Sequence, residues 1–132
     1  MKTVIASIAL TVLTAVIPRT GHSTDKNGGY ATLMSHQEGS CSHFVSARDD
    51  ARRGDYGRQN KYLVWLSGYI TAYNAEVSDT YDIMGAKDMP SLLQWLENEC
   101  RRDPLEEFTK ATEHLMTWLY PDRTRSGPED PP

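Results

Sequence analysis

Hydrophobic positions recur at helical spacing along residues 62–74, the segment with the most apolar and aromatic bulk outside the N-terminus. Neighbouring members of this stripe are three or four residues apart, which is the period of one helix face. The stripe consists of Tyr62, Trp65, Leu66, Tyr69, Ile70 and Tyr73. Gly68 lies within it, and because glycine costs a helix interior about 1 kcal/mol relative to alanine, we expect a close helix crossing there. The pattern predicts a central helix at residues 58–76.

Two amphipathic segments lie on either side of this central helix in the sequence. Residues 41–52 predict a short helix with Phe44 on its inner face. Residues 88–102 predict a longer one, because Asp88 is a favourable N-cap and Pro90 fits a first turn. Both segments have one apolar face for burial against the central helix.

A fourth helix is predicted at residues 104–119. Asp103 stands at its N-cap, Pro104 at the first helical position and Glu106 at the third, which is the pattern of a capping box. Glu106 and Lys110 are spaced for an i, i+4 ion pair. The four segments together predict a small all-α bundle.

The first 23 residues have the pattern of a secretory signal peptide. Lys2 precedes an apolar run, Val4 to Ile17, that is short for a membrane span. Small residues favour cleavage after Ser23, and a cut after Ala15 is the alternative. An uncleaved membrane anchor is a second alternative.

The rest of the chain divides into three parts by composition. Residues 24–40 are rich in glycine and polar side chains, which predicts a flexible mature N-terminus. Residues 41–120 hold the predicted helical domain. Residues 121–132 hold three further prolines after Pro121 and several charges, which predicts a disordered tail.

The chain is mildly acidic. Its net charge is −4, and loss of residues 1–23 removes Lys2 and Arg19 but no acid, which gives −6. Such a chain is poorly suited to nucleic acid or to an anionic membrane. No further apolar run has the length of a membrane span.

Two cysteines are present, Cys41 and Cys100. An even pair in a small secreted domain favours a disulfide, with two unpaired thiols as the alternative. Closing a loop of this length stabilises a fold by about 4 kcal/mol in the chain-entropy model. The bond would tie the first predicted helix to the third.

The sequence contains no recognisable catalytic or cofactor motif. His36, Cys41 and His43 are close in sequence, but a paired cysteine in a secreted chain favours oxidation over metal ligation. A paired-histidine helix, a phosphate-binding loop, a nucleophile elbow and a Cys-x-x-Cys pair are all missing. We therefore expect no metal, no cofactor and no enzymatic activity, although His114 and many carboxylates are present.

The remaining candidates are aromatic and apolar side chains. Core packing explains most such residues, but tyrosine and tryptophan also suit partner surfaces, because they combine a large apolar area with a polar tip. The candidate partner surface consists of Tyr62, Trp65, Leu66, Tyr69, Tyr73 and Trp95. Trp118 is a further aromatic of the same kind.

The order of these features resembles the HdeA/HdeB family of periplasmic acid-stress chaperones. The resemblance covers about residues 40–119 and consists of features in a fixed order rather than one strong motif. After the signal peptide come Cys41 with Phe44-Val45, a Gly68-Tyr69-x-x-Ala72-x-Asn74 helix, a Tyr81-Asp82-Ile83-x-Gly85 turn, Pro90, Cys100, Asp103-Pro104 and a terminal amphipathic helix.

The resemblance implies an orthogonal four-helix bundle with one disulfide, dimeric and inactive at neutral pH. Members loosen in acid, expose apolar surface and keep other periplasmic proteins in solution. By position, Cys41 and Cys100 would form the family's disulfide. The helix that carries Trp65, Tyr69 and Tyr73 would supply the hidden client or dimer surface.

The composition permits an acid response. Protonating all 18 carboxylates and the three histidines that remain after cleavage takes the charge from −6 to about +15. Self-repulsion then rises while carboxylate caps and ion pairs weaken. Asp88, Asp103 and Glu106 are the predicted acid-sensitive carboxylates.

Two other functions remain open. The first is a periplasmic binding or inhibitor protein for one partner, such as a secretion-system immunity protein of the Tai type. Such a protein binds at neutral pH through a fixed surface, whereas a chaperone binds many clients in acid. The second is a secreted helical protein of another role.

Overall fold

The computed structural model describes residues 25–27, 29–34 and 38–128. The chain forms two units, residues 1–31 and residues 32–132. In the first unit, Asp25 closes a turn by accepting hydrogen bonds of 2.8 Å from the amides of Asn27 and Gly29. The predicted signal peptide, residues 1–23, lies outside the described residues.

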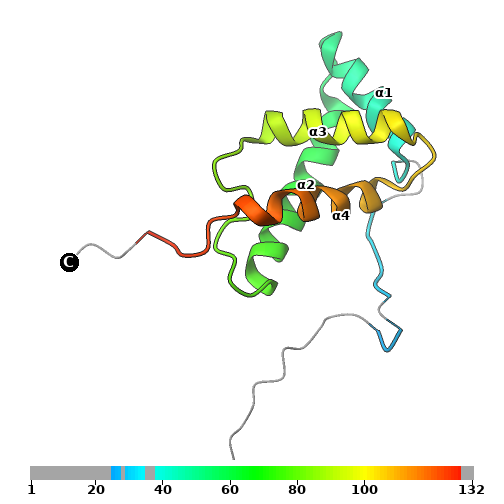
Figure 1. Ribbon diagram of the computed structural model, residues 1–132. Helices are drawn as coiled ribbons and strands as arrows, with labels where there is room; N and C mark the ends of the chain where they lie inside the picture. The colour runs from blue at the N-terminus through cyan, green and yellow to red at the C-terminus, as the bar shows by residue number, and fades with distance from the viewer. Residues whose placement is uncertain (1–24, 28, 35–37, 129–132) are drawn as a thin grey trace, which may run out of the picture. The chain divides into compact units, whose positions relative to one another are not determined.

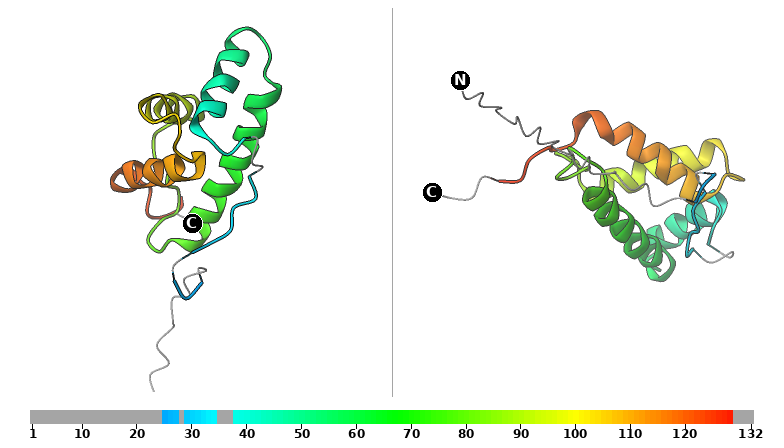
Figure 2. Two further views of the ribbon diagram at one scale, coloured as in Figure 1. Left: turned by 90° about the vertical axis from the view of Figure 1, so that its right-hand side faces the viewer. Right: turned by 90° about the horizontal axis from the view of Figure 1, so that it is seen from below.

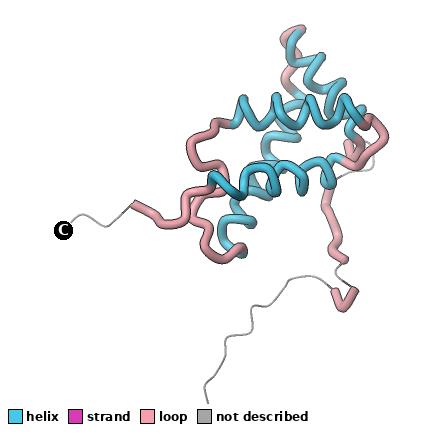
Figure 3. Tube along the Cα trace, in the orientation of Figure 1, coloured by secondary structure: helices cyan, strands magenta, loops and turns pink. Residues whose placement is uncertain are grey.

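The second unit contains four α-helices, and the described residues include no β-strand, only two isolated bridges. The helices are α1 (Cys41–Arg52), α2 (Gly57–Glu76), α3 (Met89–Arg102) and α4 (Phe108–Leu119), followed by the short 3-10 helix η1 (Tyr120–Asp122). Figures 1 and 3 show α3 and α4 side by side, and the left view of Figure 2 shows that the pair α1 and α2 crosses them. The predicted all-α four-helix bundle is confirmed.

The core is centred on three aromatic rings from three helices. Phe44 of α1, Tyr62 of α2 and Phe108 of α4 lie with ring centroids 4.7–5.1 Å apart, and all three are buried. Edge-to-face and tilted contacts of this kind stabilise a core beyond the area they bury. The Cys41–Cys100 disulfide joins α1 to α3, as predicted.

The fourth helix begins later than the sequence predicts. Residues 104–107 pair with the chain before α1 instead: the Cys41 amide donates to the Glu106 carbonyl at 2.9 Å, and the Phe108 amide donates to the Gly39 carbonyl at 2.8 Å. Residues 104 and 105 form a turn closed by the Glu106 amide, which donates to the Asp103 carbonyl at 3.2 Å, and Glu107 is extended, so α4 begins only at Phe108. Asp103 is therefore the C-cap of α3 and not the N-cap of α4, and Leu105, which lies within the predicted fourth helix, is 91% exposed in the loop.

Two further predictions about helix surfaces are wrong. A Cβ on Gly68 would meet nothing within 4 Å, so Gly68 faces open space and no helix crosses there. Lys110 pairs with Glu113 at 2.6 Å rather than with Glu106, because Glu106 precedes α4 and is not one helical turn from Lys110.

The start of the predicted disordered tail is ordered. After η1, Thr124 pairs with Asp82 through backbone hydrogen bonds of 2.8 and 3.1 Å. Arg123 is buried, donates to the Asp79 and Tyr120 carbonyls at 2.9 and 2.7 Å, and stacks on the Tyr120 ring. These contacts hold the segment after α4 against the loop between α2 and α3. Residues 129–132 lie outside the described residues.

Within the described residues, no helix is long and apolar enough to cross a membrane.

Candidate functional site

The predicted partner surface on α2 divides into a buried and a half-exposed part. Tyr62 and Leu66 are fully buried in the core. Trp65, Tyr69 and Tyr73 pack against the core but keep part of their surface in solvent. Trp65 lies against Tyr69 and Phe108, with ring centroids 5.3 and 5.7 Å apart. These three rings therefore pack against the core and still have part of their surface in contact with solvent.

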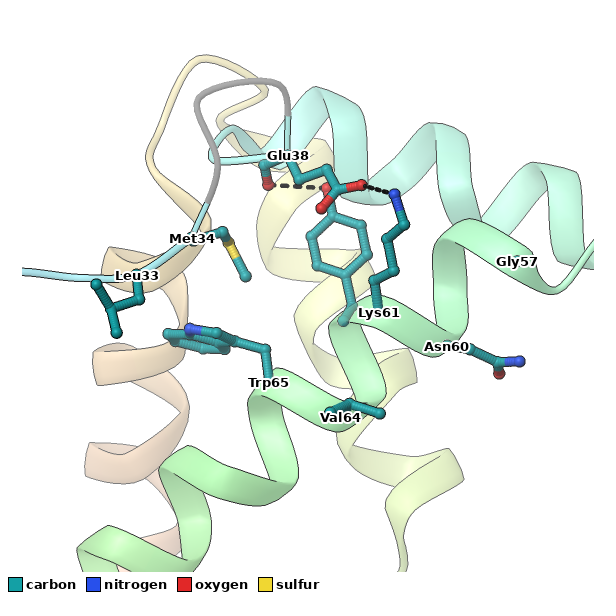
Figure 4. Close-up of a pocket in the computed structure, with 9 residues that line it drawn as sticks. Leu33, Met34, Glu38, Gly57, Asn60, Lys61, Val64 and Trp65 are labelled. Carbon is teal, nitrogen blue, oxygen red and sulfur yellow. Dashed lines mark hydrogen bonds and ion pairs between the residues drawn. The ribbon is translucent and has the colours of Figure 1, made fainter.

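A groove opens beside Trp65 (Figure 4), and we call it the α2 groove. Its volume is about 730 Å³. Figure 4 shows the indole of Trp65 beside Leu33 and Met34, which come from the segment before α1. Leu33 is 96% exposed and Val64 75% exposed. The groove is lined by Leu33, Met34, Glu38, Gly57, Asn60, Lys61, Tyr62, Val64 and Trp65.

Glu38 fastens this segment to α2 in two ways, which we call the Glu38 clasp. Its carboxylate accepts from Lys61 Nζ at 2.7 Å, and its carbonyl accepts from the Tyr62 hydroxyl at 2.8 Å. Burial raises the pKa of Tyr62 to about 12, and the Glu38 carboxylate adds to the rise. The phenol of Tyr62 therefore stays protonated and remains a hydrogen-bond donor to the Glu38 carbonyl.

Trp95, the last member of the predicted surface, is on α3 and away from the α2 groove. Its ring stacks on that of Trp118 at 5.5 Å, and the Lys87 ammonium lies 4.9 Å from the Trp118 ring centroid. The pair borders a second hollow of about 480 Å³ that also contacts Asp88. The sequence-predicted surface therefore forms two separate aromatic sites rather than one.

The predicted acid-sensitive carboxylates have different roles. Asp88 is the N-cap of α3 and accepts from the Ser91 amide at 3.0 Å; the hydrogen bonds from Ser91 lower the pKa of Asp88. Asp103 accepts from the Leu105 amide at 3.2 Å in the loop after α3. Glu106 lies in the same loop, with its Oε1 3.9 Å from Nδ1 of His114.

The most buried carboxylate was not predicted from the sequence. Glu97 on α3 has only 2% of its side chain exposed and binds three guanidinium groups, from Arg48 and Arg52 on α1 and Arg101 on α3. Burial raises its pKa, but the three arginines outweigh burial and lower it to about 2. The sequence did contain a signal: Glu97 falls on the apolar stripe of its helix, between Leu93 and Cys100.

Two members of the histidine and cysteine group considered from the sequence lie within the described residues. Cys41 is in the disulfide, so its sulfur is no thiolate ligand. Nδ1 of His43 lies 3.1 Å from the Ser40 hydroxyl, and His36 lies outside the described residues.

Comparison with known proteins gives no match: no protein-family model, curated protein or solved structure matches the chain. The likeness to the HdeA/HdeB family therefore stays a prediction from the sequence.

Proposed function

We propose that this protein is a periplasmic acid-stress holdase, which binds denaturing proteins through apolar surface that acid uncovers. The observation that carries the proposal is the α2 groove. It places Trp65 of α2 beside Leu33 and Met34 of the segment before α1, and Glu38 of that segment forms an ion pair with Lys61. The proposed clients are other periplasmic proteins, with a homodimer as the resting state.

Acid would act on the whole chain through its charge. Protonation of carboxylates weakens ion pairs, while the rising positive charge of the chain favours expansion. The Cys41–Cys100 bond does not titrate, so α1 and α3 stay linked. The loosened state would then remain compact enough to bind a client and refold afterwards.

The location follows from the sequence. A signal peptide over residues 1–23 leads to export, and a disulfide that joins two helices suits an oxidising compartment. Net charge −6 for residues 24–132 keeps the resting protein soluble.

The test is light scattering of an aggregating client with the oxidised protein, residues 24–132, at about pH 2–3 and at pH 7. Suppression of aggregation in acid alone is expected, with loss of suppression after reduction of the disulfide. Trp65→Ala should weaken suppression several-fold, since it removes an apolar aromatic side chain that lines the groove. Trp118→Ala is the matched control, a tryptophan outside the groove. No suppression at either pH would refute the proposal.

A second function is favoured by one observation: the groove is already partly open, since Leu33 and Val64 are largely exposed in the folded protein. A fixed apolar groove suits a protein that binds one partner at neutral pH, such as a Tai-type immunity protein. Capture of a single periplasmic protein at pH 7, lost in Trp65→Ala and kept in Trp118→Ala, would favour this function over the holdase.

A further inference from the structure

Three side chains from three parts of the fold converge at the turn between α3 and α4. They are Glu99 on α3, Glu106 in the following loop and His114 on α4, and we call them the Glu-Glu-His group. One ligand atom from each lies within 4.8 Å of the other two. Nδ1 of His114 is 3.3 Å from Oε1 of Glu99 and 3.9 Å from Oε1 of Glu106.

We propose that the Glu-Glu-His group binds a divalent transition-metal ion of the zinc type. Zinc takes imidazole nitrogen and carboxylate oxygen at roughly 2.0–2.2 Å, so two ligands of one tetrahedral ion are about 3.4 Å apart. The two distances from His114 Nδ1 are 3.3 and 3.9 Å, close to that value. Small rotamer adjustments of partly exposed side chains would complete the geometry.

The surroundings of Glu99 fit a ligand carboxylate. Its Oε2 pairs with the guanidinium of Arg102, while its Oε1 points to His114. A metal-bound carboxylate is commonly held in this way, with its second oxygen bound by a neighbour outside the coordination shell. Arg102 would thus orient Glu99 without occupying the oxygen that the metal needs.

The charge and exposure of the group also suit a divalent cation. Glu99 and Glu106 are less than one-fifth exposed, whereas His114 is 45% exposed, so the group is open to solvent on the histidine side. Lys110, a cation near Glu106, is engaged with Glu113 at 2.6 Å. The two carboxylates supply oxygen ligands of the charge that a dication favours, and His114 supplies a ring nitrogen. The three protein ligands leave a fourth position for water.

The ligand set also indicates which metals the group should prefer. Imidazole favours zinc, nickel and copper, whereas magnesium and calcium prefer six or more oxygen ligands. A bound ion would link the end of α3, the loop and α4, and thereby stabilise the part of the fold where α4 begins. This role does not depend on the proposed holdase activity.

The experiment is calorimetric titration of the purified, oxidised protein with Zn²⁺ alone at pH 7, with Ca²⁺ and Mg²⁺ as comparisons. We expect one zinc per chain and an increase in melting temperature that a chelator reverses. His114→Ala and Glu106→Gln should each weaken zinc binding by about tenfold or more, since loss of even an outer-shell partner costs 10–100-fold. His43→Ala, an exposed histidine outside the group, should bind zinc as the parent protein does.

Any of three results would refute the proposed zinc site. The first is that the parent protein binds no zinc, and the second is that His114→Ala or Glu106→Gln binds zinc as tightly as the parent protein. The third is that His43→Ala loses as much zinc affinity as the variants of the Glu-Glu-His group. Circular dichroism of each variant without metal separates loss of a ligand from loss of fold, and Glu106→Gln changes a loop residue that is not needed for a helix. Zinc binding is measured at pH 7 without a client. An absence of zinc binding therefore does not bear on the proposed holdase activity, and an absence of holdase activity does not bear on the zinc site.

Discussion

The arginine cluster around Glu97 gives the sharpest prediction, because it ties two helices through one buried carboxylate. Both Glu97 oxygens accept from Arg52 Nη2 at 2.6 Å. Arg48 Nε donates at 3.1 Å and Arg101 Nη2 at 2.8 Å. Replacement by glutamine keeps the size of the side chain but removes the negative charge that these guanidinium groups share.

The magnitude follows from the pKa of Glu97, which falls from 4.5 to about 2 on folding. At about 1.4 kcal/mol for each pH unit, the ionised carboxylate contributes about 3 kcal/mol to the free energy of unfolding. Because Arg52 and Arg101 are half exposed, solvent screening makes this an upper figure. The folded-state pKa is the lower one, so the contribution is complete above about pH 4.5 and is lost as the pH falls towards 2.

The assay is urea denaturation of the parent protein and Glu97→Gln at pH 7 and near pH 2. At pH 7 the variant should be less stable by about 2–3 kcal/mol. Near pH 2 the difference should shrink to a small part of its value at pH 7, because the pH has then reached the folded-state pKa of Glu97 and most of the stabilisation by its charge is lost. Glu76→Gln, an exposed carboxylate on α2, should change stability by less than about 0.5 kcal/mol at either pH. An equal deficit at both pH values, or none at pH 7, would refute the reasoning.

Three more substitutions test the packing of single positions, and two of them, at Gly68 and Arg123, are at positions where the prediction from the sequence was wrong. Gly68→Ala should stabilise the protein by about 0.5–1 kcal/mol in urea denaturation, since Gly68 is in mid-helix and faces open space. Gly85→Ala is its contrast and should destabilise, because the backbone at Gly85 has φ +57° and a Cβ would collide with the Asp122 carbonyl. A loss of stability in Gly68→Ala would show that another surface packs there. Arg123→Ala should cost about 2–3 kcal/mol in the same measurement, since it removes two hydrogen bonds to carbonyls and the stacking on Tyr120. Unchanged stability would mean that the segment after α4 does not contribute to the fold.

The parts of the fold that could be predicted are those that depend on local pattern. The helices α1, α2 and α3 begin and end within a residue or so of the expected positions, because their apolar periodicity and the Asp88 cap lie within the segments themselves. The Cys41–Cys100 bond followed from the cysteine count in a secreted chain. Each of these inferences needs no knowledge of distant residues.

The errors before and after α4 lie where distant backbone segments pair. Asp103-Pro104-x-Glu106 has a good capping sequence, yet Glu107 pairs with Ser40, and that pairing delays α4. The segment after α4 has the composition of a disordered tail, yet Thr124 pairs with Asp82. Local preferences of this kind amount to about 1 kcal/mol and are readily overridden by tertiary contacts.

The candidate sites could be predicted only in part from the sequence, because they too combine residues from distant segments. Aromatic content identified Trp65, but the α2 groove also needs Leu33 and Met34, which no periodic pattern joins to α2. The Glu-Glu-His group likewise combines residues from α3, a loop and α4 that have no motif spacing. Glu97 differs from these residues because it could have been identified from the sequence: a lone carboxylate on the apolar stripe of a helix indicates a buried cationic partner.

The attachment of α1 to α3 resists acid, and this bears on the proposed function. The junction of α1 and α3 is held by a disulfide, which does not titrate, and by Glu97, whose pKa of about 2 keeps it ionised well below pH 4. This junction should therefore persist while the positive charge of the chain rises in acid, which a reversible holdase requires. If Glu97→Gln shows no pH-dependent deficit in stability, the Glu97 cluster does not hold the junction in acid, and that part of the proposed mechanism fails.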